Sequence, residues 1–238
     1  MSNYSNYTYH SKNVFKRFAH QKRFKRAIDL IQANDDIRLL DFGCGDGFFL
    51  NQLKESYSGK IDLLGFEPIL DPIENNTVCI VNSWEKVQIL VNSSDLNYVT
   101  CFEVLEYFTE QKQIELIEQI VSVLKKDGIL IVSVPVETGI PSLIKNSIRK
   151  RSCNRKYQYL YSYKNIFYAF LGKPILDYRQ GDDYLWEHIG FRFQDLEKIF
   201  SIYFHVLQKS YSPFGILGRH FNSQVFYKLQ KKIRIGFT

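Results

Sequence analysis

The segment from Ile37 to Phe42 is mainly apolar and runs directly into three closely spaced glycines, Gly43, Gly45 and Gly47. An apolar run of this length that ends at glycine predicts a buried parallel strand followed by a tight turn. Glycines let the backbone approach a ligand where a Cβ atom would collide, and a helix that begins near Asp46 would direct its free N–H groups toward that ligand. The stretch therefore predicts the strand, turn and helix of a nucleotide-binding α/β domain.

The spacing of the glycines separates two classes of nucleotide ligand. A dinucleotide-binding loop has the spacing G-x-G-x-x-G and receives an anionic pyrophosphate. In this chain Phe48 stands where the third glycine should be, and the Asp46 carboxylate would repel a phosphate. The loop therefore favours a cationic or zwitterionic ligand.

The same residues resemble the first motif of class I S-adenosylmethionine-dependent methyltransferases, a hydrophobic strand followed by D-x-G-C-G-x-G. The resemblance implies an α/β fold with a Rossmann-like, seven-stranded, mainly parallel sheet and helices on both faces. It also implies S-adenosylmethionine as cofactor, which carries a sulfonium and an amino acid tail but no phosphate. Cofactor-binding roles follow for Asp41, Gly43, Cys44, Gly45 and Asp46.

Polar residues follow the next two predicted strands. Glu67 ends the apolar run that begins at Leu63, and a carboxylate at such a strand tip can accept hydrogen bonds from both ribose hydroxyls. Asn82 follows the strand predicted over 77–81, where members of the family often carry an acidic residue that receives the adenine amino group. Asn82 keeps an acceptor oxygen. We expect Glu67 to bind the ribose and Asn82 to bind the adenine.

The fourth predicted strand, Tyr98 to Phe102, ends in Glu103-Val104-Leu105-Glu106-Tyr107. This run resembles the E-V-L-E-H sequence of small-molecule methyltransferases, and the resemblance places Phe102 and Glu103 beside the sulfonium. Relatives that make ubiquinone associate a divalent metal with the glutamates and the histidine of that sequence. Tyr107 replaces the histidine here, so the metal requirement stays open.

Three further strands, the first of them preceded by a helix, complete the predicted sheet. Apolar residues at helical spacing predict a helix over 111–124, which Lys125 to Gly128 would end, and a fifth strand over 129–134. Alternation predicts two last strands over 201–208 and 224–229, at an antiparallel edge of the sheet.

Length and composition predict one domain that spans residues 1–238. The chain is 45% hydrophobic and 24% charged, which suits a single α/β domain of this size. It has no apolar run long enough to cross a membrane, and its four cysteines lack metal-ligand spacing. We therefore expect a cytoplasmic protein with reduced thiols, with peripheral contact to the inner face of the membrane as a further option.

Charge is divided unevenly along the chain. Residues 29–137 hold 19 acidic and seven basic side chains, whereas the rest of the chain holds six acidic and 24 basic ones. Residues 1–32 predict a basic helical cap that either packs on the sheet as a solvated helix or faces a membrane or phosphate. The basic flanks indicate an anionic partner.

Residues 138–192, after the fifth strand, predict an insert that recognises the methyl acceptor. No acidic residue lies between Glu137 and Asp177, and aromatic residues are interleaved with the cations. The H-x-x-F pattern from His188 to Phe191 resembles a stretch that brings a histidine toward the acceptor in several small-molecule methyltransferases. His188 is therefore the candidate general base. Glu103, Glu106 and Glu137 are reserves.

The combined interpretation is a methyltransferase that O-methylates a small, polar acceptor, anionic or lipid-linked, such as a sugar, a lipid-linked glycan or a quinone precursor. An RNA methyltransferase is the first alternative because the flanks are basic and aromatic. Nucleic acid is less favoured, since the chain carries no attached RNA-binding module. The second alternative is a non-catalytic scaffold that binds adenosylmethionine, and the third is an NAD-dependent dehydrogenase.

Overall fold

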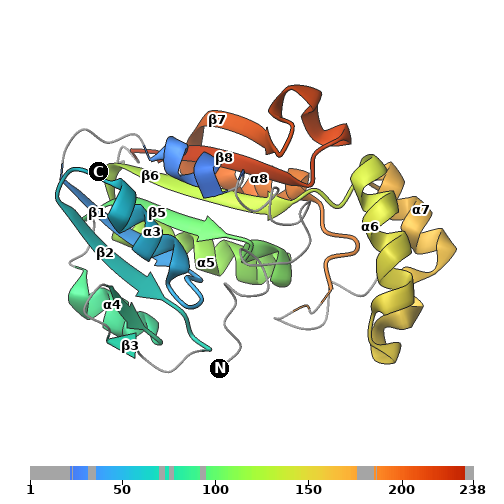
Figure 1. Cartoon of the computed structure of the whole chain (residues 1–238), viewed down its shortest axis with the longest axis horizontal. Coiled ribbons are helices and arrows are strands. Elements are labelled where there is room, and N and C mark those ends of the chain that lie inside the picture. The colour runs from blue at the N-terminus through green and yellow to red at the C-terminus, as the bar shows by residue number, and fades with distance from the viewer. Residues whose placement is uncertain are drawn as a thin grey trace, which may run out of the picture.

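A single mixed sheet organises the molecule (Figure 1). The computed structural model describes residues 22, 24–31, 36–69, 73–74, 78–91, 95–175, 185 and 187–233. Within these ranges the strands are β1 (Ile37–Phe42), β2 (Ile61–Phe66), β3 (Ile73–Glu74), β4 (Cys79–Val81), β5 (Leu96–Phe102), β6 (Leu124–Pro135), β7 (Phe204–Ser212) and β8 (Gln224–Lys231). Their order is β3-β4-β2-β1-β5-β6-β8-β7. The predicted seven-stranded, mainly parallel sheet is confirmed, and the two-residue β3 adds a short antiparallel strand at its edge.

The strand order reverses at β1, which pairs in parallel with both β2 and β5. β4 and β6 extend the parallel sheet on either side, and β8 is antiparallel to both β6 and β7. In open α/β sheets, ligands bind outside the carboxyl ends of the strands at such a reversal. The topology therefore places a binding crevice beyond Phe42 and Phe102.

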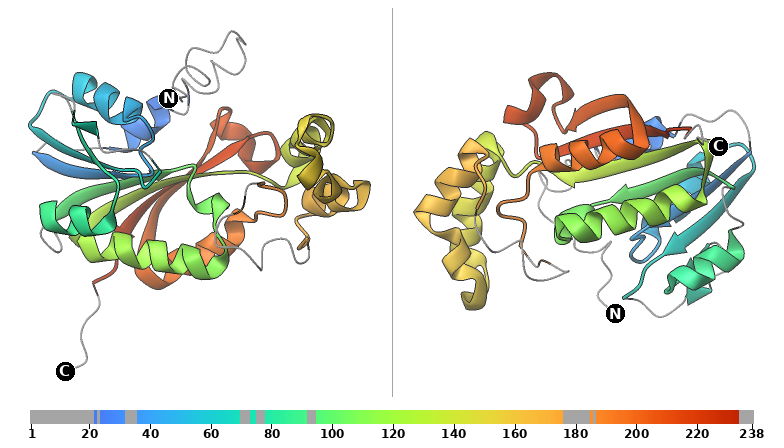
Figure 2. Two further views of the ribbon diagram at one scale, coloured as in Figure 1. Left: turned by 90° about the horizontal axis from the view of Figure 1, so that it is seen from below. Right: turned by 180° about the vertical axis from the view of Figure 1, so that it is seen from behind.

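Helices cover both faces of the sheet, as predicted (Figure 2). One face carries α4 (Trp84–Leu90), α5 (Glu110–Val123) and α8 (Phe193–Tyr203), and the other carries α3 (Phe48–Ser56) and the helical residues 24–30. Both faces of β1 are buried, and Leu39 and Leu40 are each fully inaccessible. Residues 1–21, 23 and 32 of the predicted basic cap lie outside the described residues. None of the helices formed by described residues has the length and apolar character needed to span a lipid bilayer.

Two element boundaries differ from the predictions. α5 ends at Val123, and Lys125 to Gly128 belong to β6 rather than to a helix end. A Cβ on Gly128 would lie 3.1 Å from the Leu96 carbonyl oxygen, so this glycine permits close approach of β5. In addition, α8 continues through Tyr203, so β7 begins three residues later than predicted, at Phe204. Side-chain periodicity did not reveal either boundary, because both lie where a helix passes directly into a strand.

The predicted insert follows β6 and lies at one end of the sheet (Figure 1). It contains α6 (Gly139–Ser152), the short 3₁₀ helix η2 (Arg155–Tyr161) and α7 (Tyr163–Leu171), which pack together around a small core of their own. Residues 176–184 and 186, which include the predicted acceptor-recognition aromatics Tyr178, Tyr184 and Trp186, lie outside the described residues. A further 3₁₀ helix, η3 (Gly215–His220), precedes β8.

Candidate functional site

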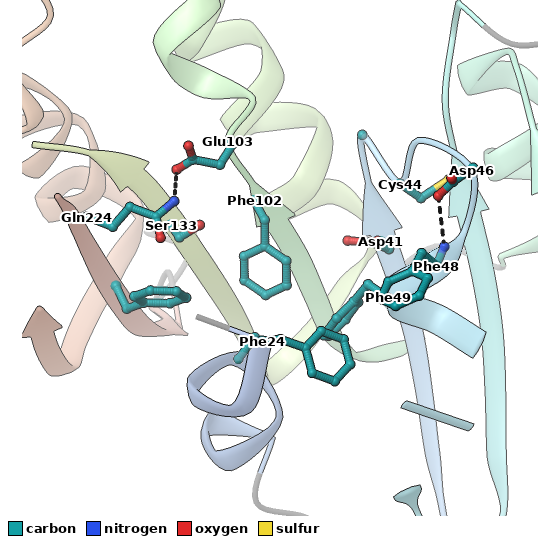
Figure 3. A pocket seen from close by; sticks show the side chains of 13 residues that line it. Phe24, Asp41, Cys44, Asp46, Phe48, Phe49, Phe102, Glu103, Ser133 and Gln224 are labelled. Atoms are coloured by element: carbon teal, nitrogen blue, oxygen red, sulfur yellow. Dashed lines mark hydrogen bonds between the residues drawn. The ribbon is translucent and has the colours of Figure 1, made fainter. Parts of the chain in front are cut away.

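A cavity lies at the carboxyl edge of the sheet, where the strand order reverses (Figure 3). It encloses about 690 Å³ of empty space, part of it open to solvent. The lining residues are Phe24, Ala27, Asp41, Gly43, Cys44, Asp46, Phe48, Phe49, Phe102, Glu103, Ser133, Gln224 and Phe226. Residues from four strands, α3, the glycine loop and the N-terminal helical residues thus converge on one cavity.

The glycine loop forms one wall of the cavity. Gly43, Gly45 and Gly47 all have positive φ, at 79°, 54° and 76°, which side chains other than glycine rarely adopt. A Cβ on Gly43 would collide with Val104, whereas a Cβ on Gly45 would meet nothing within 4 Å. The loop is anchored because the amides of Gly43 and Cys44 donate to the Phe66 carbonyl oxygen, at 2.8 and 3.1 Å. Its backbone therefore presents an open surface beside Gly45.

The charged side chains that line the cavity are all acidic. Asp41 is buried and accepts a hydrogen bond of 2.6 Å from Thr100 Oγ1. Burial raises the pKa of Asp41 to about 7, and the nearby Glu67 adds to that rise. Asp46 and Glu103 are the other lining carboxylates, and no lysine, arginine or histidine is among the lining residues that the structure describes. Such a cavity favours a cationic ligand over a phosphate.

Glu67 and Asn82 occupy different positions relative to this cavity. Glu67 lies beside the glycine loop and accepts hydrogen bonds from the amides of Gly45, at 3.1 Å, and Ile69, at 3.3 Å. Asn82 follows β4, accepts a hydrogen bond of 3.3 Å from Lys86 Nζ and is not among the lining residues. Glu67 is not a lining residue either, but the structure brings it next to the loop, whereas Asn82 contacts α4.

Glu103 has the least usual backbone of the lining residues. It is the one non-glycine residue of the described chain with positive φ, at 56°, and its amide donates to the Ser133 carbonyl oxygen at 2.9 Å. Its carboxylate accepts a hydrogen bond from Gln224 Nε2. Strained positive φ in a non-glycine residue tends to mark functional sites, because the surrounding structure must hold it there.

Apart from Phe102, sequence reasoning missed the apolar floor of the cavity and its far wall. Phe49 contacts both Phe24 and the predicted Phe102 edge to face, with ring centroids 5.7 Å and 5.0 Å apart. Ser133 and Gln224 come from β6 and β8. The sequence did contain a signal for Gln224, because this residue begins the last predicted strand. The first residue of an antiparallel strand lies at the carboxyl edge of the parallel strands beside it.

His188 lies outside the lining of the cavity. Its ring packs edge-on against Tyr107, with centroids 4.6 Å apart, and it lies close enough to Glu137 to lower the pKa of that carboxyl. The reserve candidate Glu106 is fully buried and does not line the cavity either. Within the described ranges, no three histidine, cysteine, aspartate or glutamate side chains converge as a metal site would require.

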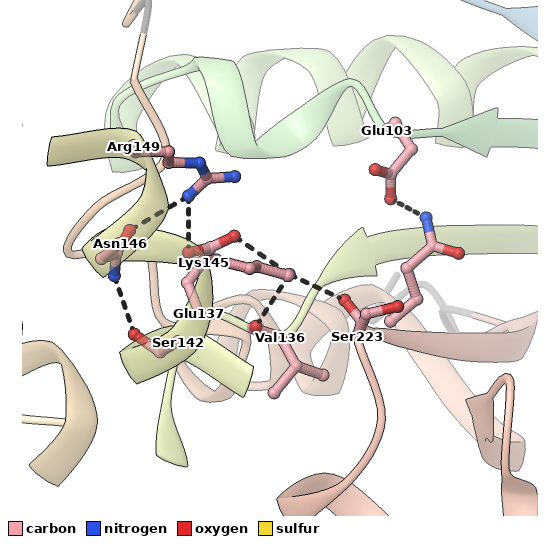
Figure 4. Close-up of polar contacts among 9 residues, drawn as sticks. Glu103, Val136, Glu137, Ser142, Lys145, Asn146, Arg149 and Ser223 are labelled. Carbon is pink, nitrogen blue, oxygen red and sulfur yellow. Dashed lines mark hydrogen bonds and ion pairs between the residues drawn. The ribbon is translucent and has the colours of Figure 1, made fainter. Parts of the chain in front are cut away.

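The other reserve candidate, Glu137, is buried in a polar network (Figure 4). Its carboxylate accepts from Lys145 Nζ at 3.2 Å and from Arg149 Nη1 at 2.9 Å. Burial alone would raise the pKa of Glu137, but Lys145, Arg149 and His188 together lower it to about 2. A carboxylate held ionised by two cations is a poor proton acceptor, so the structure argues against Glu137 as the base.

Comparison with known proteins identifies the family. A family model described as a methyltransferase domain matches residues 15–170. None of the curated protein sequences matches the chain. The chain belongs to this methyltransferase family, and it is a class I methyltransferase whose cofactor is S-adenosylmethionine.

Solved structures share the fold at low sequence identity. The magnesium protoporphyrin IX methyltransferase of Synechocystis PCC 6803, crystallised with SAH, is 12% identical, with a TM-score of 0.57 over 93% of this chain and 89% of that chain. The PH0226 protein of Pyrococcus horikoshii OT3 is 13% identical, with a TM-score of 0.59 over 97% of each chain. A cyclopropane synthase of Mycobacterium tuberculosis is 11% identical, with a TM-score of 0.54 over 94% of this chain and 88% of that chain.

The cavity fits this cofactor on two observations of the structure. The lining carboxylates match a sulfonium and an ammonium group, and no basic side chain among the described lining residues is present to bind the pyrophosphate of a dinucleotide. The loop that forms one wall also leaves open space beside Gly45, where a Cβ atom would meet nothing within 4 Å. The cavity therefore does not favour the alternative of an NAD-dependent dehydrogenase.

Proposed function

We propose that this methyltransferase transfers a methyl group to a hydroxyl oxygen of a small polar acceptor, such as a sugar, a lipid-linked glycan or a quinone precursor. The observation that supports this proposal is the Glu103 carboxylate, held at the cavity by a strained backbone and by Gln224. When bound, adenosylmethionine supplies an electrophilic methyl group. A hydroxyl acceptor needs a base beside that group, and a lining carboxylate can accept the proton.

The proposed donor site uses the glycine loop and the acidic side chains around it. Asp41 and Asp46 would attract the positively charged parts of the donor, and Gly43, Cys44 and Gly45 would support it with their backbone. Glu67 would exchange its hydrogen bonds with Gly45 and Ile69 for the ribose hydroxyls. Phe102 would border the sulfonium, and Asn82 would bind the adenine.

Two residues compete for the role of base. Histidine is a common general base, but His188 lies beside Tyr107, outside the lining of the cavity. Glu103 lines the cavity directly. We therefore propose Glu103 as the group that accepts the proton, and His188 as a residue that positions the acceptor from the side of the insert.

The acceptor is found by incubating the protein with labelled adenosylmethionine and fractionated cell extract, followed by mass analysis of the labelled product. The proposal predicts a small methyl ether. Labelled RNA would support the alternative RNA methyltransferase, and no labelled product in any fraction would support a non-catalytic scaffold.

Matched variants then assign the base on the identified acceptor. Glu103→Gln should lower kcat by about 10²-fold or more and lower donor affinity in calorimetry much less, because the proton acceptor is lost while Asp41 and Asp46 remain to attract the donor. Glu85→Gln on α4 is the control. His188→Gln should raise KM for the acceptor more than it lowers kcat. A full loss of kcat in His188→Gln, with activity retained in Glu103→Gln, would assign the base to His188.

Calorimetry with adenosylmethionine alone tests the donor site. Gly45→Val should abolish detectable binding, because a branched side chain would occupy the open space of the loop and φ would be strained. Glu67→Ala should weaken binding through the lost ribose contacts. Gly215→Val, at another glycine with open space, is a control for folding. Unchanged donor affinity in Gly45→Val would contradict the proposed donor site.

A further inference from the structure

α6 is an amphipathic helix that turns its polar side toward the body of the domain, whereas a surface helix usually buries its apolar side. Its inward side carries Ser142, Lys145, Asn146 and Arg149, which contact one another or Glu137 (Figure 4). Ser142 and Asn146 are fully buried, and Lys145 Nζ also donates to the carbonyl oxygens of Val136 and Ser223, each at 3.2 Å. The polar side of the helix is therefore fixed to the body of the domain.

The apolar side of α6 points away from the body. Its aliphatic residues, at helical spacing, are between 40% and 62% exposed: Ile140, Leu143, Ile144 and Ile148. The neighbouring α7 adds a second exposed row at a spacing of four residues: Tyr163, Phe167 and Leu171. The two helices pack together, and Lys150 of α6 lies 3.2 Å from the centroid of the Tyr163 ring. We call these seven apolar residues the α6–α7 face.

The segment that carries the α6–α7 face is strongly basic. Residues 138–176 contain eight lysines and arginines and no acidic residue. Glu137 binds two of these cations, Lys145 and Arg149. Among the described residues, no acidic side chain forms a salt bridge with any of the other six: Lys150, Arg151, Arg155, Lys156, Lys164 and Lys173. An apolar surface accompanied only by cations matches an anionic, apolar environment.

We propose that the α6–α7 face docks onto the anionic surface of a lipid membrane. Interfacial helices bury an apolar row at the level of the lipid headgroups and carry lysine and arginine beside it, while aromatic residues such as Tyr163 suit the headgroup boundary. Lysine stems can lie along an apolar surface and leave the charge in the headgroup layer. The ammonium group of Lys150 lies over the Tyr163 ring and so places a cation beside this apolar row.

Two other occupants explain fewer of these observations. The centre of a protein interface is depleted in lysine and other charged residues, whereas cations accompany both exposed rows here. RNA would use the cations and the aromatic rings, because it binds through phosphates and base stacking. It would leave Ile144 and Ile148 exposed to water without a function.

Docking would bring the membrane close to the cavity without covering it. α6 begins shortly after the carboxyl end of β6, whose Ser133 lines the cavity. Lys145 binds the carbonyl oxygen of Ser223, the residue next to Gln224 in the cavity wall. The network that fixes α6 thus connects the docking face directly to the edge of the site.

Vesicle flotation of the full chain tests the proposal without any assay of activity. The protein is mixed with phosphatidylcholine vesicles that contain or lack phosphatidylglycerol, at low and high salt. We expect binding only with phosphatidylglycerol and weaker binding in high salt. Ile144→Ser combined with Ile148→Ser keeps the net charge and should weaken the partition coefficient by at least about tenfold, because the apolar contribution is lost.

The matched control is Ile89→Ser combined with Ile202→Ser, two isoleucines exposed by 79% and 55% on α4 and α8. This control should bind vesicles like the parent protein. Failure to bind anionic vesicles would overturn the proposal, as would equal binding by the two double variants. Sedimentation velocity tests for a dimer, and retention of RNA tests for binding of nucleic acid. A dimer that dissociates in the Ile144→Ser, Ile148→Ser variant would assign the face to a second copy instead. RNA binding with no vesicle binding would assign it to nucleic acid.

Discussion

Two helices of equal length show how differently the body and the insert of this domain are built. α5 and α6 each contain 14 residues. α5 buries Leu116, Ile117 and Ile120 against the sheet and exposes its charged side, as a helix of a soluble domain does. α6 buries a serine and an asparagine and exposes isoleucines. Of 14 residues each, α5 has six aliphatic residues that mainly serve the core, whereas the four of α6 are exposed at the surface.

The two regions also treat buried carboxylates differently. Asp41, at the cavity, is buried with a threonine hydroxyl as its hydrogen-bond donor, and its pKa is raised. Glu137, at the start of the insert, is equally buried, but two cations and His188 hold its pKa low. A buried acid without a cation is suited to attract a cationic ligand, whereas one with two cations is already satisfied and fixes structure. The contrast separates the binding region from the anchoring region.

The largest expected effect distinguishes the two helices directly. Ile117→Ala should lower the free energy of unfolding by about 4 kcal/mol, because the side chain is fully buried in the main core. Ile144→Ala on α6 should change it by less than about 0.5 kcal/mol, because that side chain is 57% exposed. Urea denaturation of both variants measures the difference. Equal losses would mean that α6 also uses its apolar side for folding.

The anchoring network should show the next largest effect. Glu137→Ala should lower the free energy of unfolding by about 3 kcal/mol, because it leaves Lys145 and Arg149 without their common acceptor. Glu110→Ala, at the first turn of α5, is the control and should cost much less. A loss no greater than that of the control would show that the network does not fix α6.

The sequence predicted the body of the domain far better than the insert. Buried parallel strands such as Ile37–Phe42 are rich in apolar residues, and a glycine follows the strand. The strand and its end could therefore be predicted from the neighbouring residues alone. The outward isoleucines of α6 gave the same helical spacing that a core helix gives, and spacing does not tell which side faces the protein. That choice depends on Glu137, which lies outside the helix and attracts its cations only in the folded chain.

The candidate site shows the same limit. Six of its predicted residues could be named because they follow strands in order: Asp41, Gly43, Cys44, Asp46, Phe102 and Glu103 line the cavity. Phe24 and Gln224 reach the same cavity from opposite ends of the chain, and no local pattern connects them. Asn82 was assigned to the adenine only because it follows a strand at the position where the family often has an acidic residue. In the structure it follows the short β4 and does not line the cavity.

Acid should weaken the anchoring region through Glu137. The folded-state pKa of about 2 lies below the ordinary value of 4.5, so the stabilisation is fully present above pH 4.5 and is lost as the pH falls toward 2. By pH 3 the loss from this group should reach about 2 kcal/mol. Denaturation of the parent protein and of Glu137→Ala at pH 7 and pH 3 checks this, because their difference in stability should narrow by that amount. A constant difference would contradict the assigned pKa.

Asp41 should also lose its effect as the pH falls, but near neutrality and in ligand affinity rather than in anchoring. Its pKa of about 7 means that roughly half of the free protein carries a neutral Asp41 near neutrality, and a cationic donor prefers the ionised form. The affinity for adenosylmethionine should therefore fall by up to about tenfold between pH 8 and pH 6. Asp41→Asn should remove this part of the dependence, while Asp127→Asn, on the exposed start of β6, should keep it. Protons that the ligand itself gains contribute equally to the slope of affinity against pH in the parent protein and in both variants. Comparing these slopes therefore isolates the contribution of Asp41. If Asp41→Asn retained the full slope in calorimetry, Asp41 would be a structural acid like Glu137, and the contrast between the two regions would not extend to their carboxylates.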